Sequence, residues 1–384
     1  MKQDWVYKTF GEVGVFLRGK NIQKADFVEH GLPCIHYGQI HTKFGISVDN
    51  HLSEIQEDVY NKAIIASHGD LIIAITSEDL DGSCKSTAWL GNYDIAVSSH
   101  AAIYKHNLNP KFIAYYLRSN SFYIEKGKYA RGFKVIEIKT KDLAQIPIPV
   151  PSIEIQNKVV AELDRINKMI CIKKEQLTEY DKLSQSIFYE MFGNPIENDK
   201  KWESKKMSEV GEIITGSTPS TSDASNWDGD TNWVTPAELD MQLYYGETKR
   251  KITEKAAKSL RLMPKGTVLL STRAPIGKLA ITTVPMCCNQ GFKNIICGEL
   301  VNNIFLYYYL LLTMDKIKAM GRGATFKEVS KSAISGYYVL LPNIELQKKF
   351  AERIKAIEKQ KSMITSSIHE LETLLASRMQ YWFD

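Results

Sequence analysis

The feature that most constrains this chain is a repeat shared by its own two halves. The stretch PSIEIQNKVVAEL begins at Pro151, and the similar stretch PNIELQKKFAERI begins at Pro342, 191 residues later. Matches at the same offset continue on both sides, as with Glu137 and Glu328. Solenoid repeats have periods of roughly 20–50 residues, whereas this period is about half the chain. The sequence therefore predicts a tandem duplication of one large module.

Each copy predicts a globular part followed by a long helix. Ser152 and Asn343 each follow a proline and are good N-cap residues. Gly193 and Pro195 are typical of a helix end. Between these signals, apolar residues alternate at steps of three and four, which predicts a heptad seam. We expect this seam to contain Leu163, Ile166, Ile170, Leu177, Ile354, Ile357, Ile364, Ile368 and Leu371.

The two seams are interrupted at different places. Lys173 in the first helix aligns with Ile364 in the second, and Lys361 aligns with Ile170. Interruptions of this kind favour pairing with a defined partner over self-pairing. At 1.5 Å per residue, a helix of about 40 residues is a rod of about 60 Å, which suggests a spacer. The alternative is two unrelated amphipathic surface helices.

Length and composition bound the class of protein. The 384 residues suit about two to four domains, and 44% hydrophobic with 24% charged residues is typical of a globular chain. A net charge of +5 permits a polyanionic partner without requiring one. The six cysteines form no C-x-x-C pair and are expected to be reduced thiols. The apolar run from Ile304 is too short for a membrane span of about 20 residues and is expected to be a buried element. The reduced thiols predict a cytoplasmic protein.

The globular parts predict an α+β fold with short strands, for example GDLIIAI from Gly69 and KGTVLLS from Lys265. A long polar loop, TGSTPSTSDASNWDGDTNWVTP, begins at Thr215, and its residue types suit hydrogen bonds to phosphates and base edges. The segment KRKITEKAAKSLRLMPKG from Lys249 is expected to be a helix with a basic face, a candidate phosphate-binding surface. The corresponding segment of the first half, SEIQEDVYNK, is acidic.

Motifs of catalysis are missing from the sequence. It contains no phosphate-binding G-x-x-x-x-G-K-[ST] loop, no DNA amino-methyltransferase motif and no helicase motif. Glu137 and Lys139 form the E-x-K half of a nuclease metal site, but no Pro-Asp precedes them. His36 and His41 lack accompanying carboxylates. The sequence therefore predicts no catalytic centre and no metal site, and a nuclease built on Glu137 is a minor alternative.

The ordered, twofold recurrence of these motifs resembles the specificity subunit of type I restriction–modification systems. The segments that carry the resemblance are EIITGSTPSTSDASNWDGDTNWVTPAELD, LMPKGTVLLSTRAPIGKLAITTVPMCCNQGF, IPIPVPSIEIQNKVVAELDRI and LLPNIELQKKFAERIKAIE. The resemblance implies two tandem target-recognition domains of α+β class. Each is followed by a long helix, and the two helices pair as an antiparallel coiled coil with pseudo-twofold symmetry. The expected boundaries are recognition domains at 1–151 and 199–341, and helices at 152–198 and 342–384.

The same resemblance implies the function and the partners. Each recognition domain is expected to read one half of a bipartite double-stranded DNA site, without catalysis by this chain. Two modification subunits are expected to dock on it and to methylate adenine from S-adenosylmethionine, which the partner binds. A restriction or translocase subunit can join them. The alternative is a helical-hairpin scaffold or RNA-binding adaptor without bipartite specificity.

Arg273 is the strongest candidate for a base contact, followed by Gln290. The alternative for Arg273 is a local pair with a carboxylate. The first domain departs from the family pattern, with GKNIQK in place of the T-P-S stretch, so its base contacts stay open. The full set of expected DNA-binding residues is Arg18, Lys20, Arg131, Lys134, Thr218, Ser220, Lys255, Lys258, Arg273, Lys278, Gln290, Lys293 and Arg322.

Overall fold

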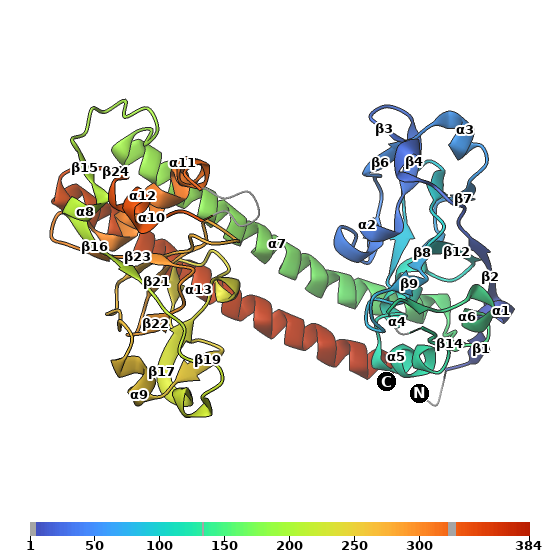
Figure 1. Cartoon of the computed structure of the whole chain (residues 1–384). Coiled ribbons are helices and arrows are strands. Elements are labelled where there is room, and N and C mark those ends of the chain that lie inside the picture. The colour runs from blue at the N-terminus through green and yellow to red at the C-terminus, as the bar shows by residue number, and fades with distance from the viewer. Residues whose placement is uncertain (1–4, 133, 322–327) are drawn as a thin grey trace. The chain divides into compact units, whose positions relative to one another are not determined.

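The chain divides into two compact units, each of which takes part of both long helices. The computed structural model describes residues 5–132, 134–321 and 328–384. Unit 1 comprises Met1–Lys174 and Ser366–Asp384, and unit 2 comprises Glu175–Thr365. The long helices are α7 (Ile153–Phe192) and α13 (Ile344–Phe383), each of 40 residues (Figure 1).

Unit 1 is built on two five-stranded sheets. The first contains, in spatial order, β2 (Gly14–Arg18), β12 (Ala101–His106), β8 (Leu71–Ala74), β10 (Ser86–Trp89) and β5 (Ser47–Val48). The second contains β3 (Phe27–Val28), β6 (Ser53–Ile55), β4 (Leu32–Ile35), β11 (Ile95–Val97) and β7 (Ile64–Ala66). Two short ladders join β1 (Tyr7–Thr9) to β14 (Pro147–Pro149), and β9 (Thr76–Ser77) to β13 (Ile136–Glu137).

Unit 2 repeats the first of these sheets strand for strand. Its five strands are β16 (Gly211–Thr215), β23 (Lys293–Cys297), β20 (Val268–Leu270), β21 (Leu279–Thr282) and β18 (Tyr244–Tyr245). A three-stranded sheet contains β19 (Arg250–Ile252), β17 (Trp227–Val234) and β22 (Cys287–Cys288), and a ladder joins β15 (Ser204–Lys206) to β24 (Tyr338–Leu340).

Strand direction repeats along with strand order. In the first sheet of unit 1 and the five-stranded sheet of unit 2, every neighbouring pair is antiparallel except the last, which is β10–β5 in unit 1 and β21–β18 in unit 2. The second sheets also share one parallel pair, β4–β11 and β17–β22. The duplication predicted from the sequence is therefore confirmed at the level of topology.

Short helices connect the strands. In unit 1 they are α1 (Phe10–Val13), α2 (Tyr37–Thr42), α3 (Glu57–Tyr60), α4 (Pro110–Tyr116), α5 (Asn120–Gly127), α6 (Thr140–Leu143) and the 3-10 helix η1 (Lys24–Asp26). In unit 2 they are α8 (Met207–Val210), α9 (Glu254–Lys258), α10 (Asn303–Leu312), α11 (Met314–Ala319), α12 (Lys331–Ser335), η2 (Ala224–Asn226) and η3 (Pro236–Glu238). None of the helices in the described ranges is long and apolar enough to cross a membrane.

The basic helix expected from Lys249 is wrong in extent. Only α9 is helical, while Lys251 and Ile252 belong to β19, which pairs with β17 across a bulge. The acidic segment of unit 1 is likewise divided between β6 and α3. In both places strand pairing with a segment distant in sequence outweighs the local helical pattern.

The long helices begin and end at their capping signals. The Asn343 side chain accepts a hydrogen bond from the Glu345 amide at 2.8 Å, and Ser152 accepts from the Ile155 amide at 3.4 Å. Helix α7 ends at Phe192, where Gly193 has a φ of +76°, a conformation that glycine adopts without strain. These helix starts and the helix end were predicted correctly.

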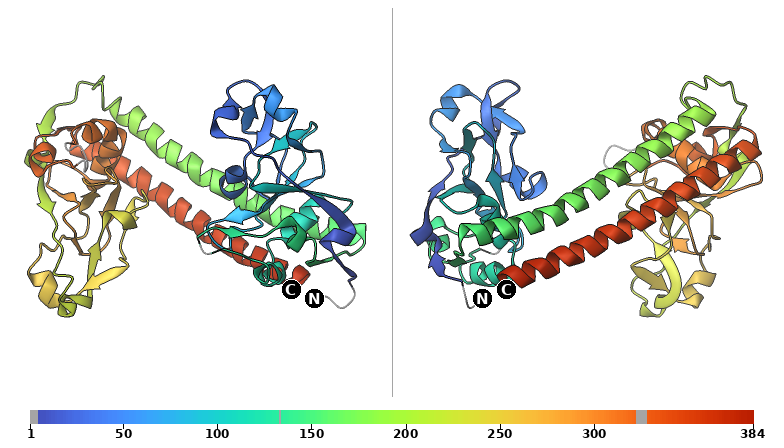
Figure 2. Two further views of the ribbon diagram at one scale, coloured as in Figure 1. Left: turned by 45° about the vertical axis from the view of Figure 1, so that its right-hand side comes forward. Right: turned by 180° about the vertical axis from the view of Figure 1, so that it is seen from behind.

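Within each unit the segments of α7 and α13 lie side by side and run in opposite directions (Figure 2). In unit 1, ion pairs join Glu162 to Arg378, and Lys174 to Glu372 at 2.8 Å. In unit 2, Lys361 pairs with Asp181 at 2.7 Å. Six of the nine expected seam residues are buried, namely Leu163, Ile166, Ile170, Ile354, Ile357 and Ile368. The other three, Leu177, Ile364 and Leu371, are partly buried.

A buried glutamine in the first turn of each long helix joins that helix to its globular part. In unit 2, the Gln347 Oε1 accepts from the Asn302 amide at 2.8 Å, and its Nε2 donates to the carbonyls of Pro342 and Leu300. In unit 1, Gln156 makes the equivalent bonds with the Asn109 amide and the Pro151 carbonyl, both at 2.8 Å. We call Gln156 and Gln347, with these main-chain partners, the glutamine clasps.

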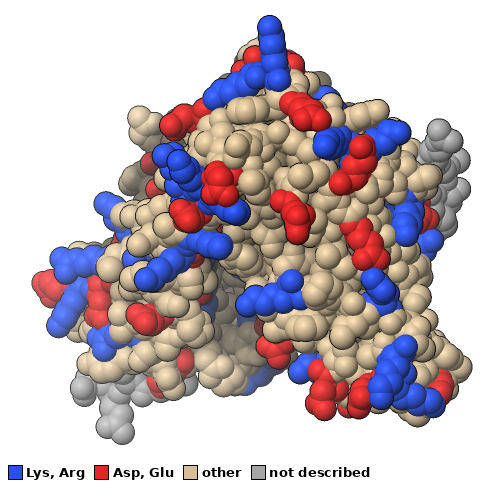
Figure 3. Space-filling model, turned by 90° about the vertical axis from the view of Figure 1, so that its left-hand side faces the viewer, with Lys and Arg blue, Asp and Glu red and all other residues tan. Residues whose placement is uncertain are grey.

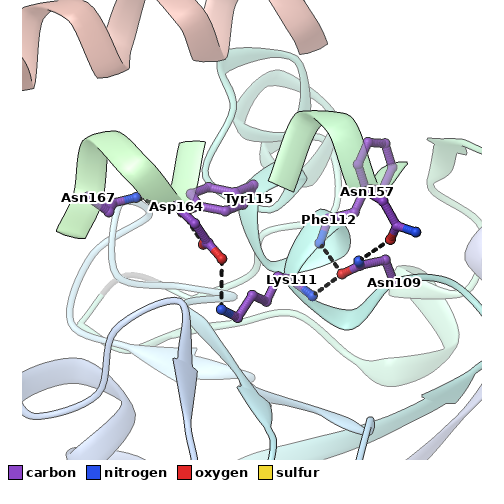
Figure 4. Close-up of polar contacts among 7 residues, drawn as sticks. All are labelled: Asn109, Lys111, Phe112, Tyr115, Asn157, Asp164 and Asn167. Atoms are coloured by element: carbon purple, nitrogen blue, oxygen red, sulfur yellow. Dashed lines mark hydrogen bonds and ion pairs between the residues drawn. The ribbon is translucent and has the colours of Figure 1, made fainter. Parts of the chain in front are cut away.

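Helix α4 extends the clasp of unit 1 along α7 (Figure 4). The Asn109 side chain caps α4 and donates to Asn157 at 2.8 Å. About two turns further along α7, Lys111 and Tyr115 both bond to the carboxylate of Asp164, each at 2.8 Å. Since α4 also packs on strands β8 and β10, these bonds tie the sheet of unit 1 to the helix.

Replacing Gln347 with alanine is expected to lower the free energy of unfolding of unit 2 by about 3 kcal/mol. The change leaves the buried Pro342 carbonyl and two part-buried groups, the Asn302 amide and the Leu300 carbonyl, without their partner. An unpaired buried group costs about 1–3 kcal/mol. Denaturant titration would measure the loss, and hydrogen exchange at the Asn302 amide would locate it. Gln360→Ala, at an exposed position of α13, is the matched control and should change stability by less than about 0.5 kcal/mol. Unchanged exchange at Asn302 would contradict the prediction.

Candidate nucleic-acid interface

The polar loop of unit 2 is held in place by two tryptophans. The indole of Trp227 donates to the Ser220 carbonyl, and that of Trp233 to the Ser217 carbonyl, both at 3.1 Å. The Thr218 hydroxyl donates to the Gln290 side chain at 2.7 Å, although the two residues are 72 positions apart. The fold therefore brings together three predicted contact residues, since Thr218, Ser220 and Gln290 all belong to this loop or bond to it.

Helix α9 borders the same loop. Thr253, its N-cap, donates its hydroxyl to the Ser225 carbonyl at 3.0 Å, and Lys255 reaches the Ser225 hydroxyl at 3.4 Å. Lys258 pairs with Glu254 at 2.9 Å, and both side chains are largely exposed. An exposed pair of this kind is weak, so Lys258 can exchange the carboxylate for a phosphate.

Arg273 and Lys293 share one carboxylate. Glu328 lies 2.9 Å from the Arg273 Nε and 3.2 Å from the Lys293 Nζ. Burial alone would raise the pKa of Glu328, but its hydrogen bonds to Arg273 and Lys293 and their charges outweigh that effect and lower it. The carboxylate pairing foreseen as the alternative for Arg273 is thus present. The Lys293 side chain is only 6% exposed, so it supports the carboxylate from beneath.

Removing the negative charge of Glu328 is expected to strengthen binding to duplex DNA of any sequence. Glu328→Gln frees the charge of exposed Arg273 for phosphates, so affinity should rise about 3- to 10-fold at low salt, with a steeper salt dependence. Fluorescence anisotropy with random duplexes over a salt series would measure both. Glu212→Gln is the control, because it frees Arg261 from a pair that is more exposed than that of Arg273 and Glu328. An affinity that changes equally in both variants would contradict a DNA-facing Arg273.

In unit 1 an arginine also forms an ion pair with the glutamate that corresponds to Glu328 in the repeat. Arg18 on β2 lies 3.1 Å from Glu137, the counterpart of Glu328. Arg131 lies 3.4 Å from Asp142 and forms a backbone bridge with Glu137. Three of the predicted residues form no such cluster: Lys20 and Lys134 are exposed, and Lys278 of unit 2 is partly buried. Arg322 lies outside the described residues.

A groove of unit 1 was missed by the sequence analysis. It has a volume of about 730 Å³ beside the β9–β13 ladder. Its lining combines aromatic, acidic and basic side chains, including Tyr37, His41, Glu78, Asp79, Lys85 and His100. The ladder corresponds to the Arg273–Glu328 bridge of unit 2, so the groove lies at the equivalent place of the repeat. The only sequence signal was the polar stretch TSEDLDGSCK.

Basic and acidic side chains are mixed on the one face of the molecule that Figure 3 shows, where they alternate over short distances. The described residues contain no group of three or more His, Cys, Asp or Glu side chains that could hold a metal ion. All six cysteines are free thiols. The arrangement suits hydrogen bonding and selective ion pairing more than nonspecific binding to a uniform polyanion.

Comparison with known proteins assigns the repeated units to a family. A family model described as the type I restriction modification DNA specificity domain matches the chain twice, over residues 2–180 and 199–373. The chain belongs to this family. It carries two tandem DNA specificity domains, and the resemblance inferred from the sequence is confirmed.

Individual relatives agree with this assignment. The MjaIX specificity subunit of Methanocaldococcus jannaschii is 43% identical over 158 residues, which cover 40% of this chain and 37% of that protein. The putative MjaX specificity subunit of the same organism is 25% identical over 93% of this chain and 87% of that protein. A solved chain from work on complex assembly and conformational transition of the type I R-M system shares the fold, with a TM-score of 0.60 at 19% identity. That match covers 100% of this specificity chain and 98% of the solved one.

Proposed function

We propose that this chain is the DNA-reading subunit of a type I restriction–modification complex, and that each specificity domain reads one half of a bipartite duplex site. The observation that carries the proposal is the duplication of one sheet in both units. In each copy an arginine forms an ion pair with the equivalent glutamate, Glu137 in unit 1 and Glu328 in unit 2. Two similar scaffolds with different loops suit two half-sites of different sequence.

In this proposal α7 and α13 form an antiparallel coiled coil with pseudo-twofold symmetry, which sets the unread gap between the half-sites. The ion pairs of the two helices within each unit support it, as does the burial of the seam. The glutamine clasps support it further, because they fix each globular part to the start of its own helix. The expected boundaries, 1–151, 152–198, 199–341 and 342–384, belong to the same proposal.

The chain itself is proposed to be non-catalytic. Modification subunits, two per chain, would supply adenine methylation from S-adenosylmethionine, and a restriction or translocase subunit would complete the complex. Support comes from the family assignment and from the related structure, whose subject is assembly of the type I R-M system. Exposed apolar residues on α7, including Met169 and Ile172, are available for such contacts.

Methylome sequencing tests this proposal directly. A host that carries the gene together with its modification subunit should methylate adenines in a motif of two short sequences separated by a fixed unspecified gap. A continuous motif, or preference for RNA over duplex DNA in a parallel binding selection, would reject the proposal in favour of an adaptor or scaffold.

A further inference from the structure

Arg250 differs from the arginines nearest to it in the sequence. Arg261 pairs with Glu212 at 2.9 Å, and Arg273 pairs with Glu328 at the same distance. The guanidinium of Arg250 has no carboxylate within 4.0 Å and no hydrogen bond among the parts of the chain that the structure describes. The residue is exposed, at the start of edge strand β19. Its five N–H donors are therefore open to a ligand.

Two indole rings fix the position of this guanidinium. Its Cζ lies 3.6 Å from the ring centroid of Trp227 and 5.5 Å from that of Trp233. The two rings are perpendicular, with centroids 5.2 Å apart. Both indole N–H groups are already bonded to the polar loop, so the rings cannot turn freely. An arginine held against an aromatic face loses less side-chain entropy on binding than a free one.

The surroundings of Arg250 are those of a recognition surface. Trp227 bonds to Ser220 of the polar loop, and the loop continues through Ser225 to Thr253 and Lys255 at α9. A small apolar core of Trp233, Ile252, Ala256 and Cys287 lies beneath the strands and helix. This surface therefore combines the positioned N–H donors of Arg250 with serine and threonine hydroxyls and a lysine, above a small apolar core.

We infer that Arg250 reads a base edge, a guanine in the major groove of the half-site contacted by unit 2. The inference rests on the proposed function. Guanine presents two acceptors, O6 and N7, at the spacing of two guanidinium donors, and arginine to guanine is the commonest specific contact of this kind. A phosphate could also accept two hydrogen bonds from the guanidinium, but a phosphate contact does not require the guanidinium to be held in a fixed position.

The test uses the chain in complex with its modification subunit and selection from randomised duplexes. Arg250→Lys keeps the charge but loses the planar fork. We expect one position of one half-site to lose about 5- to 150-fold discrimination, while the other half-site and the affinity for random DNA stay unchanged. Arg261→Lys, the matched control, should leave the whole motif intact. Trp227→Phe retains an aromatic face and should relax the same position to a smaller extent.

A modified base makes the test independent of folding. Wild-type complex should lose affinity when the guanine at that position is replaced by 7-deazaguanine, which lacks N7, and the Arg250→Lys complex should not respond to the replacement. Equal weakening of all duplexes by Arg250→Lys would identify a phosphate contact and overturn the inference. An unchanged motif in Arg250→Lys would overturn it as well. A wild-type complex that selects no bipartite site would instead reject the proposed function, so the two failures are distinguishable.

Discussion

Inserting seven residues after Leu177 and seven more after Ile368 is expected to widen the gap of the recognised site while both half-site sequences stay the same. Seven residues keep the register of a heptad seam, so the pairing of α7 with α13 is preserved on both sides of the insertions. The helices lengthen by about 10 Å. With about 3.4 Å per base pair, the gap should grow by up to about 3 base pairs. Methylome sequencing of the variant would measure the new gap.

A single insertion of three residues after Leu177 is the control for this experiment. It turns the rest of the α7 seam away from α13, because three residues cover less than one helical turn. We expect loss of stability and of methylation rather than a new gap. A heptad variant that folds, methylates and still prefers the original gap would show that something other than the helices sets the spacing.

Exchange of one specificity domain should change one half of the methylated motif completely. Replacing Lys201–Leu341 with the corresponding segment of a family member is expected to retain the half-site read by unit 1 and to introduce the donor's half-site in place of the other. The physical reason is that unit 1 keeps its own sheets and core in the hybrid. Methylome sequencing of the hybrid and of both parents measures the outcome.

The junctions of this exchange follow from the glutamine clasp of unit 2. Gln347 remains in the host helix, so the incoming segment must offer a main-chain N–H at the place of Asn302. A second hybrid with proline at that place provides the control, since it lacks the N–H and should fold poorly. Simultaneous change of both half-sites in the first hybrid would contradict independent reading by the two units.

The long helices and the duplication could be predicted because their signals are local or repeated. Ser152, Asn343 and Gly193 act within one helical turn, and the 191-residue offset is visible in the sequence itself. The helix expected from Lys249 was wrong because the pairing of β19 with β17 is decided by a strand about 20 residues away and by a bulge. A local pattern carries no information on such a partner.

The candidate interface was predicted in part, for a similar reason. Loop residues such as Thr218 and Gln290 were recognised by their type, and the structure brings them together. Arg250 was missed because its significance depends on cross-strand register, which places it opposite Trp233. Lys293 was expected at the surface, but its strand position turns the side chain under Glu328. The groove of unit 1 draws on four separate segments, so no single stretch could reveal it.

The glutamine clasps also bear on how genes for such chains can diverge. On the globular side, the clasp of unit 2 contacts only main-chain atoms, the N–H of Asn302 and the carbonyl of Leu300. The side chains around this clasp can therefore be substituted without loss of its hydrogen bonds. Because both copies use the same joint, recombination near the helix starts yields hybrids whose parts already fit. Exchange of a whole half between two such chains would then combine two specificity domains without the need for a new joint.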